Sequence, residues 1–138
     1  LTFNEEHNIA DCLESVRWAD EVIVVDSEST DRTVEIAQQY TPHVFIQPWL
    51  GYSGQRNFGL SKASGDWVFF LDADERVTPE LRDSIQEVLQ HSDVYNAYSI
   101  VNENYFMNRF LKSFRETHTR LFRNGTVQYV GDVHEAPV

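Results

Sequence analysis

Cysteine, basic residues and long apolar runs are scarce in this chain of 138 residues. A single cysteine, Cys12, excludes an internal disulfide and is typical of a reducing compartment, so we expect a cytoplasmic protein. Eleven Lys and Arg stand against 22 Asp and Glu, and the net charge of −11 argues against a nucleic-acid-binding surface. No apolar run approaches the roughly 20 residues that span a bilayer, and no stretch has the pattern of a signal peptide.

The composition that remains is ordinary for a folded domain, with 41% hydrophobic and 13% aromatic residues. A chain of this length can bury a core of its own. There is no initial Met, and residues 1–3 have the pattern of the end of a strand. We therefore expect residues 1–138 to form one domain that belongs to a longer protein and is truncated at both ends.

The most informative stretch is residues 67–75, in which an apolar run is followed by Asp72 and Asp74. Such a run predicts a strand that is buried on both faces inside a mostly parallel sheet. Ligands of these sheets bind beyond the carboxyl ends of the strands. On a strand, two residues at spacing two point to the same side, and paired carboxylates repel each other unless a cation shares them. The pair therefore indicates a Mg²⁺ or Mn²⁺ site, although loops after strands are often acidic only because they are solvated.

The first two thirds of the chain read as alternating strands and helices. We expect helices to begin at Asn8, at Ser29 or Thr30, near Gln55 and at Thr78-Pro79. Inward-facing positions of the third helix are assigned to Phe58 and Leu60. Strands are expected at residues 21–25, 43–47 and 67–71. This order predicts an α/β fold with a mostly parallel central sheet flanked by helices.

The last third has a different pattern. Residues 98–101 read as a strand, and the aromatic and basic stretch 105–114 reads as a short helix or an irregular segment. Asn124-Gly125 lies between two strand-like runs, which predicts a hairpin. The C-terminal part is therefore expected to be mixed or antiparallel. Core packing is the favoured role of the aromatic residues Tyr105, Phe106, Phe110 and Phe114, with acceptor binding or peripheral contact with the cytoplasmic membrane left open.

Four motifs in order resemble family 2 glycosyltransferases of the GT-A fold, a Rossmann-like nucleotide-diphospho-sugar transferase fold. They are residues 2–6, 24–33, 55–59 and 65–75. Residues 49–57, and 120–123 leading to 133–135, most resemble the bacterial branch that includes lipopolysaccharide core β-glucosyltransferases. The resemblance implies a UDP-sugar donor, a saccharide or lipid-linked acceptor and cell-envelope synthesis. It also implies a nucleotide-sugar-binding half at 1–92 and an acceptor-side half at 93–138.

The resemblance implies roles for residues around the donor. Thr2 and Glu5 would line the base and ribose, and Asp26 would accept a hydrogen bond from the uracil ring N–H, unless it merely caps the following turn. Many family members carry a second Asp where this chain has Ser27. Arg56 would lie near the base and the pyrophosphate, where a guanidinium can bind phosphate.

The same resemblance implies different roles for the carboxylates of Asp72 and Asp74. Asp72 would contact the ribose side, and Asp74 would hold the Mg²⁺ or Mn²⁺ that bridges the diphosphate, with both Asp residues assigned to the metal site. An inverting transfer needs a general base near the acceptor hydroxyl. Glu135 is the candidate and Asp132 the reserve. His134 could contact metal or phosphate, but a lone His is more often structural.

Other interpretations stay open at this point. A sugar nucleotidyltransferase also uses a parallel sheet and a metal, but no Gly-rich loop follows the first strand. An Asp-based phosphatase would use Asp72 as nucleophile, but Arg76 stands where that motif has Thr or Val. The non-enzymatic alternative is a nucleotide-sugar-binding module without turnover.

Overall fold

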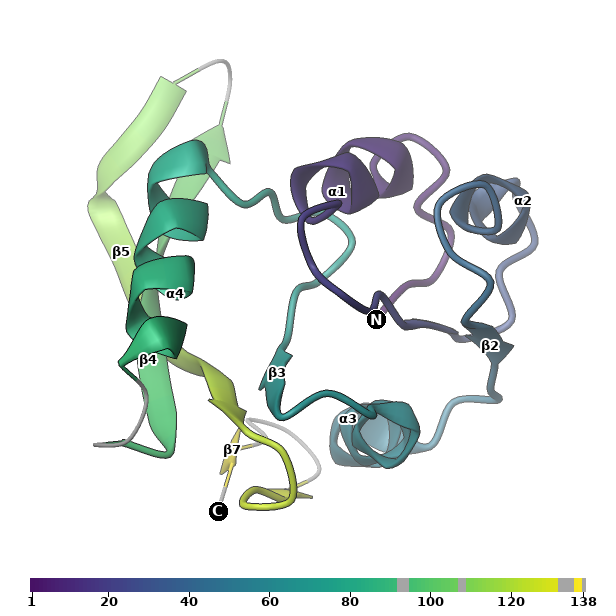
Figure 1. The fold of residues 1–138 in the computed structure, drawn as a ribbon. Coiled ribbons are helices and arrows are strands. Elements are labelled where there is room, and N and C mark those ends of the chain that lie inside the picture. The colour runs from purple at the N-terminus through teal and green to yellow at the C-terminus, as the bar shows by residue number, and fades with distance from the viewer. Residues whose placement is uncertain (92–94, 107–108, 132–135, 138) are drawn as a thin grey trace.

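The computed structural model of the chain describes residues 1–91, 95–106, 109–131 and 136–137. Helices and strands alternate through the first two thirds of these residues, and strands dominate the rest (Figure 1). The predicted α/β class, with parallel and antiparallel pairing, is confirmed.

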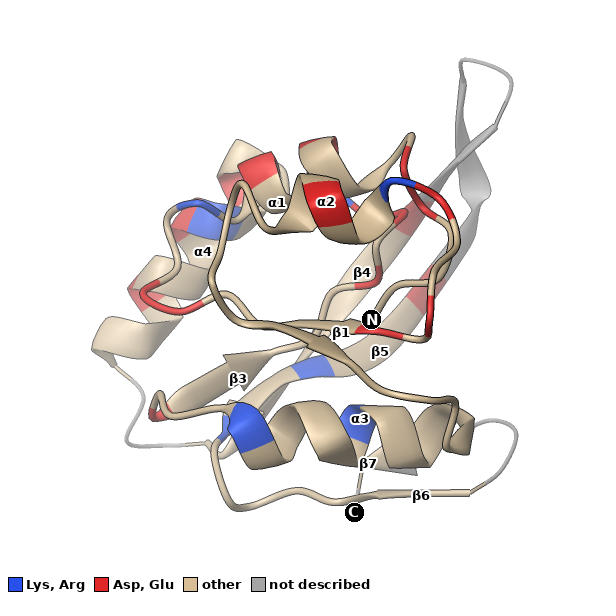
Figure 2. Cartoon of the chain, turned by 90° about the vertical axis from the view of Figure 1, so that its right-hand side faces the viewer, with Lys and Arg blue, Asp and Glu red and all other residues tan. Residues whose placement is uncertain are grey.

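The parallel part is built from β1 (Val24–Asp26) and β2 (Val44–Ile46), which pair in register from Val24 with Val44. Thr2 adds an isolated parallel bridge to Asp26. The helices α1 (Ile9–Ser15) and α2 (Thr33–Ala37) lie on one side of these strands, and α3 (Gly51–Lys62) lies on the other (Figures 1 and 2). In Figure 2, acidic residues gather on the α1 and α2 side, whereas the coloured residues of α3 are basic.

Helix α1 forms as its apolar spacing predicts. Ile9, Cys12 and Leu13 are buried, and Ile9 and Leu13 pack with Val24 and Ala37 in one hydrophobic cluster. Asn8 precedes the helix as expected, but its side-chain amide donates to the Glu5 carboxylate at 2.8 Å instead of capping the helix.

The predicted starts of the next two helices are wrong by a few residues. Helix α2 begins at Thr33 after the N-cap residue Arg32, and Asp31 Oδ1 accepts a hydrogen bond from the Thr33 backbone N–H at 3.0 Å. Helix α3 begins at Gly51, which has a φ of 78°. Its buried residues are Gln55 and Arg56, whereas Phe58 and Leu60, assigned to the core from the sequence, are only half-buried. The inward face of α3 is therefore polar in its middle turn.

The strand before the acidic pair is β3 (Trp67–Phe69), and its neighbour differs from the prediction. Among the described residues it pairs antiparallel with β5 (Arg109–Arg123), with Trp67 opposite Arg123. Its three residues are half-buried instead of buried on both faces. The apolar run continues past the strand, and its residue Phe70 packs against Phe122 and Tyr129 in an aromatic cluster.

The C-terminal half is organised by a long antiparallel pair, β4 (Ala97–Phe106) with β5. The helix or irregular segment predicted for residues 105–114 is wrong, because both strands continue into this stretch. Alternating residue types give no helical period, and the aromatic content favours strands.

Helix α4 (Pro79–Gln90) covers this sheet, as Figure 1 shows. The predicted start is confirmed, since Thr78 accepts a hydrogen bond from the Leu81 N–H at 3.2 Å and Pro79 follows it. Ile85 packs with Ile100 and Leu121, and Leu81 and Leu89 lie against the same cluster.

The turn at Asn124-Gly125 is confirmed, but the hairpin is not. Gly125 has a φ of 79°, and Thr126 N donates to Arg123 O at 3.2 Å. The next strand, β6 (Tyr129–Val130), pairs with β7 (Ala136–Pro137) instead of β5.

An apolar cavity of about 400 Å³ lies between β1 and the chain at residues 65–71. Leu1 borders it, and its terminal nitrogen donates to Leu71 O at 3.3 Å. Among the helices that the structure describes, none is both long and apolar enough to cross a membrane.

Candidate functional site at the end of strand β3

The chain turns sharply after β3. Glu75 N donates to Asp72 O at 3.0 Å, so Asp72, Ala73 and Asp74 lie in a turn beyond the strand. The strand rule that would place both Asp side chains on one side therefore does not apply. Asp72 is half-buried, Ala73 is buried in the core, and Asp74 is exposed. Asp74 makes no hydrogen bond or ion pair with any residue that the structure describes.

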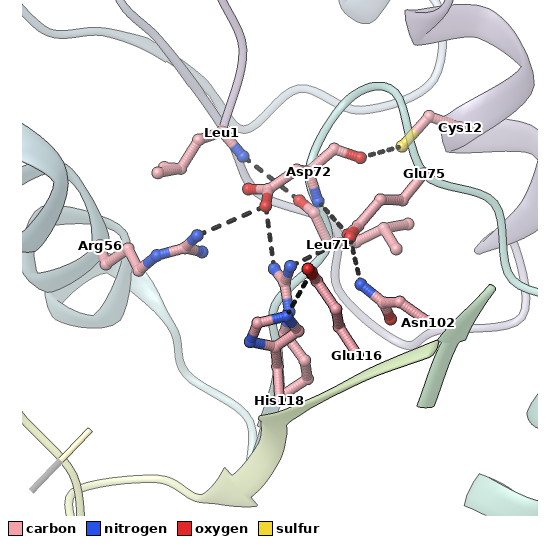
Figure 3. Close-up of polar contacts among 10 residues, drawn as sticks. Leu1, Cys12, Arg56, Leu71, Asp72, Glu75, Asn102, Glu116 and His118 are labelled. Carbon is pink, nitrogen blue, oxygen red and sulfur yellow. Dashed lines mark hydrogen bonds and ion pairs between the residues drawn. The ribbon is translucent and has the colours of Figure 1, made fainter. Parts of the chain in front are cut away.

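Asp72 lies between two guanidinium groups, as Figure 3 shows. Its Oδ2 accepts from Arg120 Nη1 at 3.0 Å and from Arg56 Nη2 at 3.4 Å. Both arginine side chains are about nine-tenths buried, with exposed fractions of 11% and 10%. Arg56 also lies over the rings of Phe70 and Tyr129, at 5.3 and 5.4 Å from their centroids. The aromatic cluster thus fixes the cation that faces Asp72.

Glu75 completes this cluster of side chains. Its Oε1 accepts from Arg120 Nη2 at 3.0 Å and from Asn102 Nδ2 at 2.8 Å, and its Oε2 accepts from the Asp72 backbone N–H at 2.9 Å. Arg120 therefore binds Asp72 with one end of its guanidinium and Glu75 with the other. The two carboxylates are balanced by two arginines, so the cluster has no excess negative charge.

The positive charges around Asp72 decide its charge state. Burial by itself would raise the pKa of its carboxyl, but the positive charges of Arg56, of the amino group of Leu1 and of Arg120 outweigh that effect and hold the pKa below its ordinary value. Asp72 is therefore ionised at neutral pH and acts as an acceptor only.

The lowered pKa of Asp72 predicts a pH dependence of stability. A carboxyl whose pKa is lower in the folded state stabilises the fold above its unfolded value, about 3.8, and this contribution is lost as the pH falls through the folded pKa. We expect Asp72→Asn to lower the free energy of unfolding at pH 7, with a difference from the parent that shrinks below pH 3.8. Urea unfolding of parent and variant between pH 7 and 3 measures this difference. Asp20→Asn, at an exposed position, is the control, and an unchanged gap across this range would contradict the assignment.

Strand β1 ends at Asp26, which is fully buried. Its Oδ1 accepts from the Ser29 backbone N–H at 2.8 Å, and its Oδ2 accepts from the Ser29 hydroxyl at 2.5 Å. The structure thus shows the turn-capping role that the sequence left as the alternative. The predicted contact with a nucleobase stays a prediction.

The N-terminal residues hold the same loop. Thr2 N donates to Val25 O and Ser27 N donates to Thr2 O, both at 3.0 Å. Thr2 is buried, and its hydroxyl has no partner among the described residues. Glu5 is half-buried, and its backbone N–H donates to Thr33 Oγ1 at 2.8 Å. The segment 2–5 therefore lies beside the loop 26–33, and the predicted roles of Thr2 and Glu5 toward base and ribose stay predictions.

Helix α3 joins the two loops through adjacent residues. Gln55 Nε2 donates to Ser27 Oγ at 2.7 Å, after β1, and Arg56 reaches Asp72, after β3. The structure therefore brings Thr2, Asp26, Arg56 and Asp72 into one connected region. The predicted general bases Glu135 and Asp132, and also His134, lie outside the described residues.

Sequence reasoning missed Arg120, Glu75, Asn102 and Gln55 as parts of this site. Arg120 and Glu75 lie inside motifs that carried the resemblance. For Arg120, the signal in the sequence was a charged residue directly before the apolar pair Leu121-Phe122, which is buried in the structure. Nothing in a single sequence indicates that Arg120 pairs with Asp72, 48 positions away.

The carboxylates at this turn could ligate a divalent cation, but they do not form a complete metal site by themselves. No group of three or more metal-ligating side chains occurs among the residues whose placement is described. Asp74 is exposed and has no ion-pair partner in the part of the chain that the structure describes, whereas Oδ2 of Asp72 is occupied by two arginines. Mg²⁺ is usually held by one or two carboxylates with phosphates completing its shell, and Asp74 fits that pattern.

Comparison with known proteins decides the family. The chain matches the family described as Glycosyl transferase family 2 over residues 1–134. The chain belongs to this family. An uncharacterized glycosyltransferase of Rickettsia felis is 48% identical over 103 residues, covering 72% of this chain and 36% of the relative. The lipopolysaccharide core biosynthesis glycosyltransferase LpsC of Rhizobium meliloti is 35% identical over 137 residues, covering 94% of this chain and 51% of LpsC.

Solved structures resemble the fold. TarS 1–349 of S. aureus in complex with UDP-GlcNAc superposes with a TM-score of 0.58 and 27% identity, over 78% of this chain and 34% of TarS. The present chain thus spans about a third to a half of the length of the proteins that it matches.

Proposed function

We propose that this chain is the donor-binding part of an inverting glycosyltransferase that takes a UDP-sugar, with a hexose such as glucose as the expected sugar. The observation that carries the proposal is the juxtaposition, at the end of β3, of Asp72 with Arg56 and Arg120, next to the exposed Asp74. Family membership and the UDP-GlcNAc complex of the similar TarS support a UDP-sugar as donor.

The charges around Asp72 suit a nucleoside diphosphate. Arg56 and Arg120 fix Asp72 as an ionised acceptor, which suits ribose hydroxyl groups. Asp74 is left to hold Mg²⁺ or Mn²⁺, which would neutralise charge on the departing diphosphate when bound. The loops at residues 2–5 and 26–29 lie side by side and would receive the base and ribose.

We assign the acceptor to the saccharides or lipid-linked saccharides of bacterial envelope polysaccharides. LpsC, named for lipopolysaccharide core biosynthesis, supports this class. Glu135 stays the proposed general base, with Asp132 as the reserve, and peripheral membrane contact is part of the same proposal.

A panel of UDP-sugars assayed with the full-length protein tests the function. We expect release of UDP with one sugar in preference to the others, dependent on Mg²⁺ or Mn²⁺ and increased by a lipopolysaccharide core acceptor. Glu135→Ala should then lower turnover while leaving donor binding unchanged. Binding of UDP-sugars without any turnover of the full-length protein would instead favour a binding module.

A further inference from the structure

Exposed apolar side chains are concentrated where β2 leads into α3. Each has between 49% and 61% of its surface exposed, and they are Ile46, Trp49, Leu50 and Tyr52. The rings of Trp49 and Tyr52 meet edge to face, with their centroids 4.9 Å apart. Apolar surface of this kind is unfavourable in water, and its concentration in one short stretch is typical of a binding surface.

This aromatic pair, Trp49 and Tyr52, also carries two unused hydrogen-bonding groups. The indole N–H of Trp49 and the hydroxyl of Tyr52 make no hydrogen bond with any residue that the structure describes. Each ring thus offers an apolar face with a polar group at its edge. A sugar ring requires this combination, because its C–H groups pack on an aromatic face while its hydroxyl groups need hydrogen-bond partners.

The stretch around the aromatic pair is uncharged. Residues 44–55 contain no Lys, Arg, Asp or Glu, although the chain has a net charge of −11. Peripheral binding to an anionic membrane uses clustered Lys and Arg beside the apolar residues, and this stretch has none. A neutral saccharide therefore fits the aromatic pair better than a phospholipid surface does.

The N-terminal half of α3 lies against the strands that flank the proposed general base in the sequence. Ser53 donates its hydroxyl to Gly131 O, and Asn57 makes two hydrogen bonds of 2.9 Å with the backbone of Tyr129. Strand β7 pairs with β6, and both strands lie beside α3 in Figure 2. Ser53 directly follows Tyr52, so the aromatic pair is close to the point where the chain enters residues 132–135.

The same stretch also reaches the donor side of the site. Gln47 N donates to Asp26 O at 2.8 Å, and Gln47 O accepts from Gln55 Nε2 at 3.2 Å. Only Pro48 separates Gln47 from Trp49 in the chain. The aromatic pair therefore adjoins both the proposed donor loop and the strands around the proposed base, and an acceptor must lie between these two.

We propose that Trp49 and Tyr52 bind the acceptor saccharide, with a sugar ring stacked on the aromatic surface and its hydroxyl groups bonded to the indole N–H and the tyrosine hydroxyl. This inference rests on the proposed function and names the acceptor contact of that same site. The ligand is defined by its chemistry, a neutral sugar ring with one apolar face.

Tryptophan fluorescence of the full-length protein, titrated with delipidated core oligosaccharide in the presence of UDP and Mn²⁺, tests the contact without turnover. Trp49 is exposed, whereas Trp18 and Trp67 are half-buried. A stacked sugar removes water from the indole, so we expect the emission to move to shorter wavelength. Trp49→Phe should abolish this shift.

Initial rates of UDP release give a second readout. Trp49→Ala should raise the KM for the oligosaccharide about 10-fold, within the range for loss of one stacked ring, and Trp49→Phe should restore most of the parent value. The affinity for UDP, measured by calorimetry without acceptor, should equal the parent's. Tyr95→Ala is the matched control, because Tyr95 is 64% exposed and also meets a ring edge to face, that of Tyr98 at 5.9 Å.

The other outcomes overturn the inference in distinguishable ways. If the parent binds UDP but shows no emission shift, or if Trp49→Ala keeps the parent's KM, the acceptor binds elsewhere and the proposed donor site stands. A loss of UDP affinity in Trp49→Ala would assign the aromatic pair to the donor. A loss of binding to vesicles of phosphatidylethanolamine and phosphatidylglycerol would assign it to a membrane. A parent that binds no UDP overturns the proposed function together with this inference.

Discussion

Asp74→Asn is expected to lower kcat/KM for the UDP-sugar by about 100-fold or more, the range for loss of one charge-stabilising group at a reacting centre. The reason is positional. Asp72 is engaged by Arg56 and Arg120, so Asp74 is the carboxylate of the pair that is free for a cation among the described residues. Asparagine keeps the size of the side chain but removes the charge that attracts the metal.

The measurement is UDP release by the full-length protein as a function of Mn²⁺ concentration. Asp20→Asn is the matched control, because Asp20 is also exposed and also makes no ion pair with a described residue. We expect Asp74→Asn to need much more Mn²⁺ and to retain its thermal stability. Turnover and Mn²⁺ dependence equal to the parent's would show that Asp74 does not hold the metal.

Arg120→Ala is expected to destabilise the fold by about 1–3 kcal/mol, less than the full cost of a deeply buried unpaired charge because Asp72 and Glu75 keep some solvent. Exposed fractions of their side chains are 31% and 25%, against 11% for Arg120. Removing the guanidinium leaves two carboxylates close together with Arg56 as the remaining cation at Asp72.

Urea unfolding compares this variant with Arg32→Ala. Arg32 also makes a two-bond contact with a carboxylate, Glu35, at 3.0 and 3.1 Å, but its side chain is 67% exposed. We expect Arg32→Ala to lower the free energy of unfolding by less than about 1 kcal/mol. Arg120→Lys should fall between them, because lysine keeps the charge but cannot bind both carboxylates in the planar geometry of arginine. Equal effects of Arg120→Ala and Arg32→Ala would mean that the cluster does not organise the site.

Local patterns predicted the elements whose cause is local. The apolar spacing of Ile9, Cys12 and Leu13 gave α1, and Thr78-Pro79 gave the start of α4, because capping and helical periodicity act within a few residues. The start of α2 was misplaced since several capping residues compete between positions 26 and 31, and the Asp31 carboxylate is the one that accepts from Thr33.

The pairing of strands that lie far apart in the chain could not be predicted from the sequence. The partner of β3 is β5, more than 50 residues later, and no local signal distinguishes this antiparallel neighbour from a parallel one. Asn124-Gly125 correctly predicted a turn, but the strand after it pairs with β7. The motifs identified Asp72 and Arg56 as candidate site residues. The bonds of Arg120 to Asp72 and Glu75 join residues far apart in the chain, so only the structure shows them.

Calorimetric titration of the full-length protein with UDP, with and without Mn²⁺, tests the central claim most directly. The account predicts binding that Mn²⁺ strengthens at least about 10-fold, equivalent to roughly 1.4 kcal/mol, and that Asp74→Asn reduces to the metal-free value. Absence of UDP binding, or binding of equal affinity with and without Mn²⁺ in parent and variant, would contradict the assignment of the turn at Asp72–Glu75 as a metal-assisted diphosphate site.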